Sequence, residues 1–352
     1  MRLESMAFAS PKSQFPIGEG GGETVIRDLL QSLHTQGLPV EVMGTYLPPQ
    51  LTHLEEGLQT LGVPLEVCPE SGLCSYQIDY TSRLSTPAGF EALMEERLTT
   101  QPQDALLIQA VDSWSAVEAA RRHGILPVFW SHNGLELDTF QEAHSLPLVL
   151  VNSQFFMDRL QQKYHMPMEL LYPAVDLDKY RIETNSHRYI TMINPVVVKG
   201  VAYLLKLALA NRDREFLVVE GWGTPPELLS IIQRIPNVTW LDRQLDMREV
   251  YNQTHILIVP SQWDEAFGRV ITEAQVNGIP VLASRVGGIP EALGTGGVLV
   301  DEIRNPEAWQ QGLAEVEARY DELSEQARSN AENFSKERAA QRLLEIFDAF
   351  PG

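Results

Sequence analysis

The sequence predicts an α/β protein built from two domains, each with a parallel sheet. Short apolar runs alternate with stretches of helical periodicity along the chain, and no internal repeat or low-complexity tract interrupts them. With 352 residues, the chain is too long for one ordinary core and fits two domains of about 150 to 180 residues. A hydrophobic content of 44% indicates packed domains rather than disorder.

The first half of the chain carries the signals of one such domain. Its expected strands lie near Leu3 to Phe8, Val40 to Met43, Ala105 to Gln109, Pro127 to Trp130 and Leu148 to Val151. Helices are expected between them, for example over Glu23 to Gln36 and Ser113 to His123. Strands that alternate with helices favour a parallel sheet.

The second half repeats this scheme. Its expected strands lie near Tyr189 to Ile193, Glu215 to Val219, Val238 to Leu241, Ile256 to Val259, Val281 to Ala283 and Val298 to Val300. The domain boundary is expected between Leu177 and Asn185, where a Pro-containing segment gives way to a polar stretch. Long helices are expected after Pro306, and the last of them, Ser335 to Phe347, carries an apolar stripe that must pack on a domain.

Glu265 and Glu273 frame the segment on which most of the functional prediction rests. Glu265 lies in the loop after the apolar run Ile256 to Val259, and Glu273 lies inside the next helix, which opens near Gly268 and stops at Gly278. That loop stands at the carboxyl end of a parallel strand, where open α/β sheets bind their ligands. Both carboxylates could therefore face one ligand around a helix N-terminus, which attracts anions. Alternatively, both are solvated acids that the helix dipole favours.

Two further helix starts could bind an anion. Gly287 and Gly288 precede Pro290, which occupies what looks like a first helical turn. Lys199 opens the predicted helix Gly200 to Asn211 and places an ammonium beside free backbone amides. This lysine could hold a departing phosphate, or it could be a solvated surface side chain.

Two features of the first half also stand at strand ends. The glycine run that includes Gly20, Gly21 and Gly22 fails the Walker A pattern and the dinucleotide fingerprint, whose last Gly would fall at Glu23. Glycine there lets the backbone approach a ligand, although a surface turn explains the run equally well. His132 follows the apolar run that ends at Trp130 and is either structural or directed at a ligand.

Residues 259 to 301 resemble the donor-binding segment of the retaining nucleotide-sugar glycosyltransferases of family 4. These enzymes have the GT-B fold, in which two Rossmann-like domains face a central cleft. The resemblance rests on the Pro260-Ser261 opening, the spacing of Glu, seven residues and Glu, the turn Gly278 to Val281, and Gly287-Gly288 with Glu291. It extends over nearly the whole chain, because Asn194 to Gly200 is similar to the family's phosphate-binding turn and Tyr172 to Tyr180 to its interdomain crossing.

The resemblance implies a domain plan. Residues 1 to 178 would form an acceptor-side domain and residues 179 to 334 a nucleotide-sugar-binding domain. The last helix, within residues 335 to 352, would cross back onto the first domain.

Roles for the carboxylates and for His132 follow from the same resemblance. Glu265 would hold hydroxyls of the donor sugar, with the backbone amides of Phe267 and Gly268 assisting, and Glu273 would hold the ribose hydroxyls. His132 would support the sugar from the other domain.

The charges that would neutralise the diphosphate depart from the family pattern at one position. The family pairs the lysine at the position of Lys199 with an arginine five positions earlier, where this chain has Asn194. Either an amide suffices there, or another cation, Arg269 or Arg243, takes the place of the arginine. Gly20, Gly21 and Gly22 would let the first domain approach the donor phosphates or the acceptor.

Composition excludes several classes of partner. The formal charge of −20 argues against nucleic acid and against a broad basic surface for anionic lipid. Two cysteines, Cys68 and Cys74, are too few for a disulfide framework and lack the spacing of a metal site. No run reaches the roughly 18 apolar residues that a membrane span requires, and the first ten residues do not look like a signal peptide, so a cytoplasmic location is expected.

The expected reaction is transfer of a sugar from a nucleoside diphosphate, of UDP or GDP type, to an acceptor hydroxyl with retention of the anomeric configuration. No carboxylate can be assigned as a nucleophile, so a front-side displacement is favoured. No metal is expected, because Asp176-Leu177-Asp178, which imitates the acidic triplet of other glycosyltransferases, falls in the interdomain crossing. Alternatives are a catalytically weakened sugar-nucleotide-binding protein, a GT-B epimerase and a two-domain solute-binding protein. Base, sugar, acceptor and oligomeric state stay open.

Overall fold

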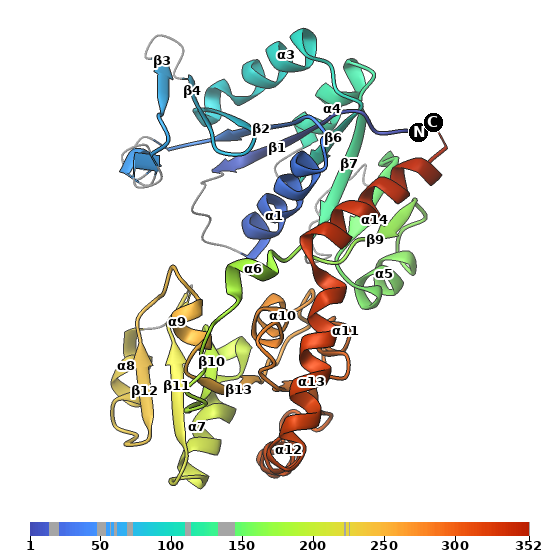
Figure 1. Ribbon diagram of the computed structural model, residues 1–352. Coiled ribbons are helices and arrows are strands. Elements are labelled where there is room, and N and C mark those ends of the chain that lie inside the picture. The colour runs from blue at the N-terminus through green and yellow to red at the C-terminus, as the bar shows by residue number, and fades with distance from the viewer. Residues whose placement is uncertain are drawn as a thin grey trace. The chain divides into compact units, whose positions relative to one another are not determined.

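A computed structural model of the chain describes residues 1–13, 21–47, 54–56, 58–59, 62–68, 73–109, 114–132, 145–221, 223–224 and 226–351. The chain forms two compact units, one made of Met1–Ala174 with Lys336–Gly352 and the other of Val175–Ser335. Each unit is a sheet of mainly or wholly parallel strands with helices on its faces (Figure 1), so the predicted α/β class with two Rossmann-like units is confirmed.

The sheet of the first unit has the strand order β3-β4-β5-β2-β1-β6-β7-β8-β9. From β5 to β9 all pairs are parallel, whereas β3 and β4 form an antiparallel edge. The strands are β1 Met6–Ser13, β2 Val40–Thr45, β3 Glu66–Cys68, β4 Leu73–Gln77, β5 Thr81–Ser85, β6 Ala105–Ile108, β7 Leu126–Ser131, β8 Leu148–Val151 and β9 Met168–Leu170. The central strands were predicted from the sequence, whereas β3, β4, β5 and β9, which are short or polar, were not.

Helices cover both faces of this sheet. The helices are α1 Gly21–Thr35, η1 Pro87–Gly89, α3 Phe90–Thr100, α4 Trp114–Arg122, α5 Gln154–Gln161 and α14 Lys336–Ala349. Leu29 and Leu33 of α1 share one apolar core with Leu343 and Phe347 of α14. The ammonium group of Met1 donates hydrogen bonds to the carbonyl oxygens of Phe347 and Phe350, at 2.9 and 2.8 Å. The C-terminal helix is therefore an integral layer of the first unit.

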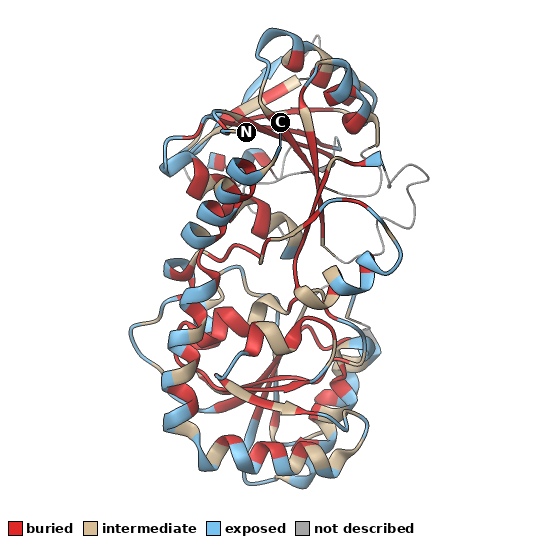
Figure 2. Cartoon of the chain, turned by 90° about the vertical axis from the view of Figure 1, so that its right-hand side faces the viewer, coloured by how far each residue is buried: buried red, intermediate tan, exposed pale blue. Residues whose placement is uncertain are grey.

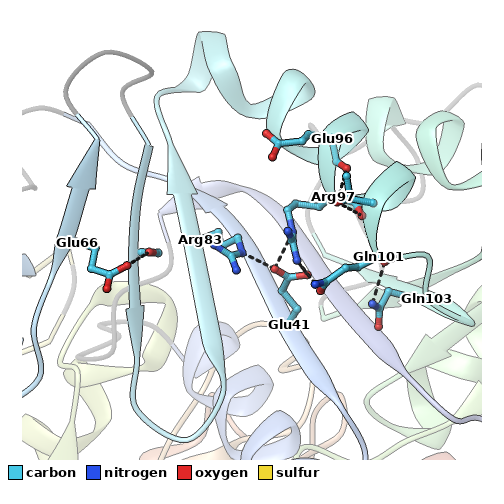
Figure 3. Close-up of polar contacts among 9 residues, drawn as sticks. Glu41, Glu66, Arg83, Glu96, Arg97, Gln101 and Gln103 are labelled. Carbon is cyan, nitrogen blue, oxygen red and sulfur yellow. Dashed lines mark hydrogen bonds and ion pairs between the residues drawn. The ribbon is translucent and has the colours of Figure 1, made fainter.

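An ion cluster joins two neighbouring interior strands of this sheet and a helix. Glu41 of β2 accepts from Arg83 Nε of β5 at 2.6 Å, and Arg97 Nε of α3 lies 3.0 Å from the same carboxylate oxygen (Figure 3). Arg97 also donates to Gln101 Oε1 at 2.6 Å. Glu41 is buried, so its charge depends on these guanidinium groups for compensation.

The sheet of the second unit is wholly parallel, with the order β12-β11-β10-β13-β14-β15. The chain winds outward from β10 to β12, then returns to place β13 on the other side of β10. The strands are β10 Tyr189–Ile193, β11 Glu215–Val219, β12 Val238–Leu241, β13 Thr254–Val259, β14 Val281–Ser284 and β15 Gly297–Val300. In open α/β sheets, ligands bind beyond the carboxyl ends of the two strands at which the winding reverses, here β10 and β13.

The helices of this unit are α6 Leu177–Tyr180, η4 Val197–Lys199, α7 Val201–Ala210, α8 Pro226–Ile232, α9 Arg248–Tyr251, α10 Arg269–Gln275, α11 Ile289–Leu293, α12 Pro306–Ala318, α13 Tyr320–Ala331 and η5 Glu332–Phe334. Apolar strand residues such as Ile190, Val218 and Ile258 pack against Leu204 of α7 and Trp309 of α12. The strands of both units are largely buried (Figure 2), so polar chemistry is left to the loops at the strand ends.

Candidate functional site

The loops that follow β10 and β13 are locked together. Gly200, which follows η4, has a φ of 82°, and a Cβ built on it would lie 1.8 Å from the carbonyl oxygen of Pro260. The backbone N–H of Gln262 donates to the carbonyl oxygen of Val198 at 2.8 Å. Only glycine tolerates both this conformation and this approach, so the residues beside Gly200 and Pro260 are held at fixed positions.

This lock brings Lys199 and Glu265 together. Lys199 Nζ donates to Glu265 Oε1 at 2.5 Å, although 66 positions separate the two residues. The same oxygen accepts from Ser261 Oγ at 2.6 Å and from Trp263 Nε1 at 2.8 Å. One carboxylate oxygen thus receives three donors at the point where the winding of the sheet reverses.

The other oxygen of this carboxylate is open. Glu265 is only 7% exposed, yet among the residues that the structure describes none donates a hydrogen bond to its Oε2. Oε2 is not one of the fully enclosed unpartnered atoms of the described residues, so a ligand hydroxyl could reach it. The ammonium of Lys199, with 22% of its side chain exposed, stands beside it as a site for an anion.

The second glycine motif packs against the backbone of Glu265. The N–H of Gly288 donates to the Glu265 carbonyl oxygen at 2.8 Å. Gly287 has a φ of 57°, and a Cβ on it would lie 2.2 Å from the same oxygen. Gly287 and Gly288 therefore support the Glu265 loop, in addition to opening α11.

Phe267 and Gly268 connect this loop to α10. The ring of Phe267 is buried and packs edge-on against Phe334, with ring centroids 4.9 Å apart. Gly268 has a φ of 98° and caps α10. Since the Phe267 side chain belongs to the core, only backbone atoms of this pair are placed to contact a ligand.

Glu273 lies in a separate buried cluster. Its Oε2 accepts from Tyr251 Oη at 2.8 Å and its Oε1 from Arg269 Nε at 2.9 Å. Arg269 also donates to Tyr180 Oη at 3.2 Å. The carboxylate and the guanidinium are both nearly covered, at 9% side-chain exposure each, so Arg269 is engaged in an internal ion pair.

Asn194 occupies a backbone conformation that suits its residue type. Its φ is 60°, a region that asparagine adopts more readily than most residues. Gly221 lies close by, because a Cβ on it would stand 2.6 Å from Cβ, Cγ and Oδ1 of Asn194. Asn194 is buried against this turn at the end of β10.

The predicted site residues of the first unit stand at its strand ends. His132 follows β7, and Asn152 Nδ2 lies 3.0 Å from its Nδ1. Burial lowers the pKa of His132 to about 4, so the imidazole is neutral at pH 7. Gly21 and Gly22 begin α1, and a Cβ on Gly22 would meet Gln109 Nε2 at 2.7 Å. Gly20 lies outside the described residues.

Sequence reasoning missed three residues that shape the site. Ser261 and Trp263 lie four and two positions before Glu265, and Tyr251 precedes β13. Hydrogen-bonding side chains so close to a candidate carboxylate are a signal that could have identified Ser261 and Trp263. Nothing in the sequence pairs Tyr251 with Glu273.

Within the described ranges, no three His, Cys, Asp or Glu side chains gather in a way that could hold a metal ion. In the same ranges, no helix is both long enough and apolar enough to cross a membrane.

Residues 188–318, which contain Lys199 and both glutamates, match the family model described as glycosyl transferases group 1. Over these residues the chain is similar to the group 1 glycosyltransferases. The resemblance that the sequence motifs indicated is confirmed.

Curated proteins similar to this chain include several D-inositol 3-phosphate glycosyltransferases. The one from Saccharomonospora viridis is 30% identical over 237 residues, which is 56% of this chain and 54% of the relative. The one from Rhodococcus jostii is 40% identical over 178 residues, which is 45% of this chain and 39% of the relative. The matched part thus spans about half or less of these relatives.

Solved structures match the chain over nearly its full length. Sucrose-phosphate synthase from Thermosynechococcus elongatus has a TM-score of 0.74 at 16% identity and covers 98% of both chains. Anabaena Alr3699/HepE in complex with UDP-glucose has a TM-score of 0.73 at 18% identity and covers 98% of this chain and 99% of that one. At such identities these structures show the fold alone.

Proposed function

We propose that this protein transfers a sugar from a nucleoside-diphosphate sugar to an acceptor hydroxyl with retention of the anomeric configuration. The observation that carries the proposal is the Lys199–Glu265 pair at the junction of β10 and β13, with Glu265 Oε2 open. Oε2 would accept from hydroxyls of the donor sugar. Glu273, in its separate cluster, would bind the ribose hydroxyls, as predicted from the sequence.

Charge stabilisation would supply most of the catalysis. When the bond between the sugar and the phosphate breaks, negative charge builds up on the diphosphate and positive charge on the sugar ring. The Lys199 ammonium would stabilise the departing phosphate, with free amides at the start of α7 beside it. Because a cation of the protein supplies this stabilisation, the proposed reaction needs no metal ion.

Glu265 is poorly suited to act as a nucleophile. Three donors on Oε1, one of them an ammonium, draw electron density from the carboxylate and stabilise its charged form. We therefore propose a front-side displacement, in which the acceptor attacks the face from which the diphosphate departs.

The donor and acceptor are proposed by class only. Alr3699/HepE is described with UDP-glucose, so a UDP sugar heads the donor panel, and GDP sugars follow. The names of the relatives place inositol phosphates first among the acceptors to test. The involvement of His132 and of Gly20 to Gly22, and the cytoplasmic location, stay predictions.

The test is a donor and acceptor screen on the purified protein, with release of nucleoside diphosphate, product mass and anomeric configuration as readouts. Glu265→Gln and Lys199→Met should each lower turnover by about 100-fold or more. Lys206→Met, an exposed lysine of α7, and Glu307→Gln, an exposed acid of α12, are matched controls that should retain wild-type rates.

Three outcomes would refute the proposal. Near-wild-type turnover in both site variants would remove the assignment of these residues. Nucleotide-sugar binding without transfer to any acceptor would favour a binding protein. Conversion of the donor in the absence of an acceptor would favour an epimerase.

A further inference from the structure

Trp263 contacts both members of the central pair with one side chain. Its Nε1 donates to Glu265 Oε1 at 2.8 Å, and Lys199 Nζ lies 5.4 Å from the centroid of its ring. Trp263 is nevertheless 43% exposed, whereas Ser261, the other neutral donor to Oε1, is fully buried. Trp263 is thus the most exposed of the three donors to Oε1.

The two contacts of Trp263 act on different degrees of freedom. A carboxylate can rotate about its last side-chain bond and exchange its two oxygens, and the indole N–H opposes that rotation by binding Oε1. A lysine ammonium sits on a flexible four-carbon stem, and the face of the indole attracts it to one side of the loop. Without the indole, the ion pair would keep its charges but lose two of its orientational constraints.

These two contacts determine the orientation of the open oxygen, Glu265 Oε2. If Trp263, Ser261 and Lys199 hold Oε1, then Oε2 keeps one orientation and is left to accept from a ligand. An error of about 1 Å in the position of such a group costs on the order of 100-fold in rate, because the reaction depends on orientation.

We propose that Trp263 is a positioning residue for transfer, one that presents Glu265 Oε2 to the donor sugar and keeps the Lys199 ammonium beside the departing phosphate. This inference rests on the proposed function. It assigns to Trp263 no contact with the reacting atoms, so its removal should affect the transition state more than the binding of the donor.

The test compares three variants at Trp263 by steady-state kinetics with the donor and acceptor found in the screen. Trp263→Phe keeps an aromatic face for Lys199 and deletes the N–H, and kcat should fall about 10-fold with donor KM changed less than about 3-fold. Trp263→Leu deletes both contacts, and kcat should fall about 100-fold. Trp263→His restores a ring N–H and should recover part of the loss seen in Trp263→Phe.

Trp240→Phe is a matched control, because it removes an indole N–H at another position. Trp240 Nε1 donates to Asp242 Oδ1 at 2.9 Å, also across two positions, so Trp240→Phe deletes an indole N–H from a carboxylate outside the site. This variant should keep wild-type kcat. Thermal unfolding of every variant checks that the second unit stays folded, and the exposure of Trp263 makes a large loss of stability unexpected.

The outcomes separate the two claims. An active wild type with unchanged kcat in Trp263→Phe and Trp263→Leu overturns the positioning role and leaves the transferase assignment standing. A rise in donor KM with unchanged kcat also overturns it, because Trp263 would then bind the donor directly. A wild type that transfers no sugar overturns the proposed function, and the positioning role with it.

Discussion

Gly200→Ala should destabilise the second unit and separate Lys199 from Glu265. The new Cβ would stand 1.8 Å from the Pro260 carbonyl oxygen and 2.7 Å from its carbon, both of them backbone atoms that cannot rotate away. The φ of 82° adds the usual cost of a left-handed residue, about 1 to 2 kcal/mol. Relief of the overlap requires a backbone shift that costs a further 1 to 3 kcal/mol, roughly, so we expect a total of about 2 to 5 kcal/mol.

Gly37→Ala isolates the conformational part of this cost. Gly37 has a φ of 91°, but a Cβ there would meet no atom within 4 Å, so only about 1 to 2 kcal/mol should be lost. Urea unfolding, with separate transitions fitted for the two units if they unfold independently, measures both free energies. The same Gly200 variant should lose transferase turnover, because the lock that places Lys199 is broken. Equal losses of stability in the two variants would refute the argument from close approach.

Three further predictions concern charge and burial. Glu41→Gln should lower the free energy of unfolding of the first unit by about 2 to 3 kcal/mol, because two arginines, one of them partly solvated, lose their counter-charge. The control Glu91→Gln, at an exposed position, should lower it by less than about 0.5 kcal/mol. Urea unfolding measures both losses, and equal losses would contradict this prediction. Tyr251→Phe should cost about 1.5 to 3 kcal/mol in the second unit by the same assay, because a buried oxygen of Glu273 loses its donor, and a neutral effect would count against that hydrogen bond. Burial lowers the pKa of His132 from 6.5 to about 4, so the unfolded chain binds more protons than the folded chain between these pH values. As the pH falls from 6.5 to 4, the wild type should lose up to about 3 kcal/mol more stability than His132→Asn. Parallel pH profiles of stability for the two proteins would be inconsistent with a buried neutral imidazole.

Local patterns in the sequence were sufficient for the class of fold and for most central strands. Apolar runs such as 256–259 and 281–283 bury both faces, and this property depends only on neighbouring residues. The edge strands β3 and β4 escaped prediction because they are polar and partly exposed, so no hydrophobic pattern marks them. Their place is set by contacts across the sheet, because β4 pairs with β5 and β3 pairs with β4.

The candidate site divides in the same way. Lys199, Glu265 and Glu273 could be selected from motif spacing, since each stands near a strand end and a helix start. Spacing could not show that Glu273 would be enclosed by Tyr251 and Arg269, because that enclosure depends on how α9 and α10 pack. It also could not assign Trp263 a role.

By itself, the amino-acid order determined which segments become strands and helices and which charged residues stand at their ends, because periodicity and turn chemistry act over a few residues. Only the tertiary structure decided that β13 returns to the side of β10, which brings an ammonium and a carboxylate 66 positions apart to within 2.5 Å. The choice of neighbour in a parallel sheet is made by long crossovers and by the packing of whole layers, and no local pattern encodes it.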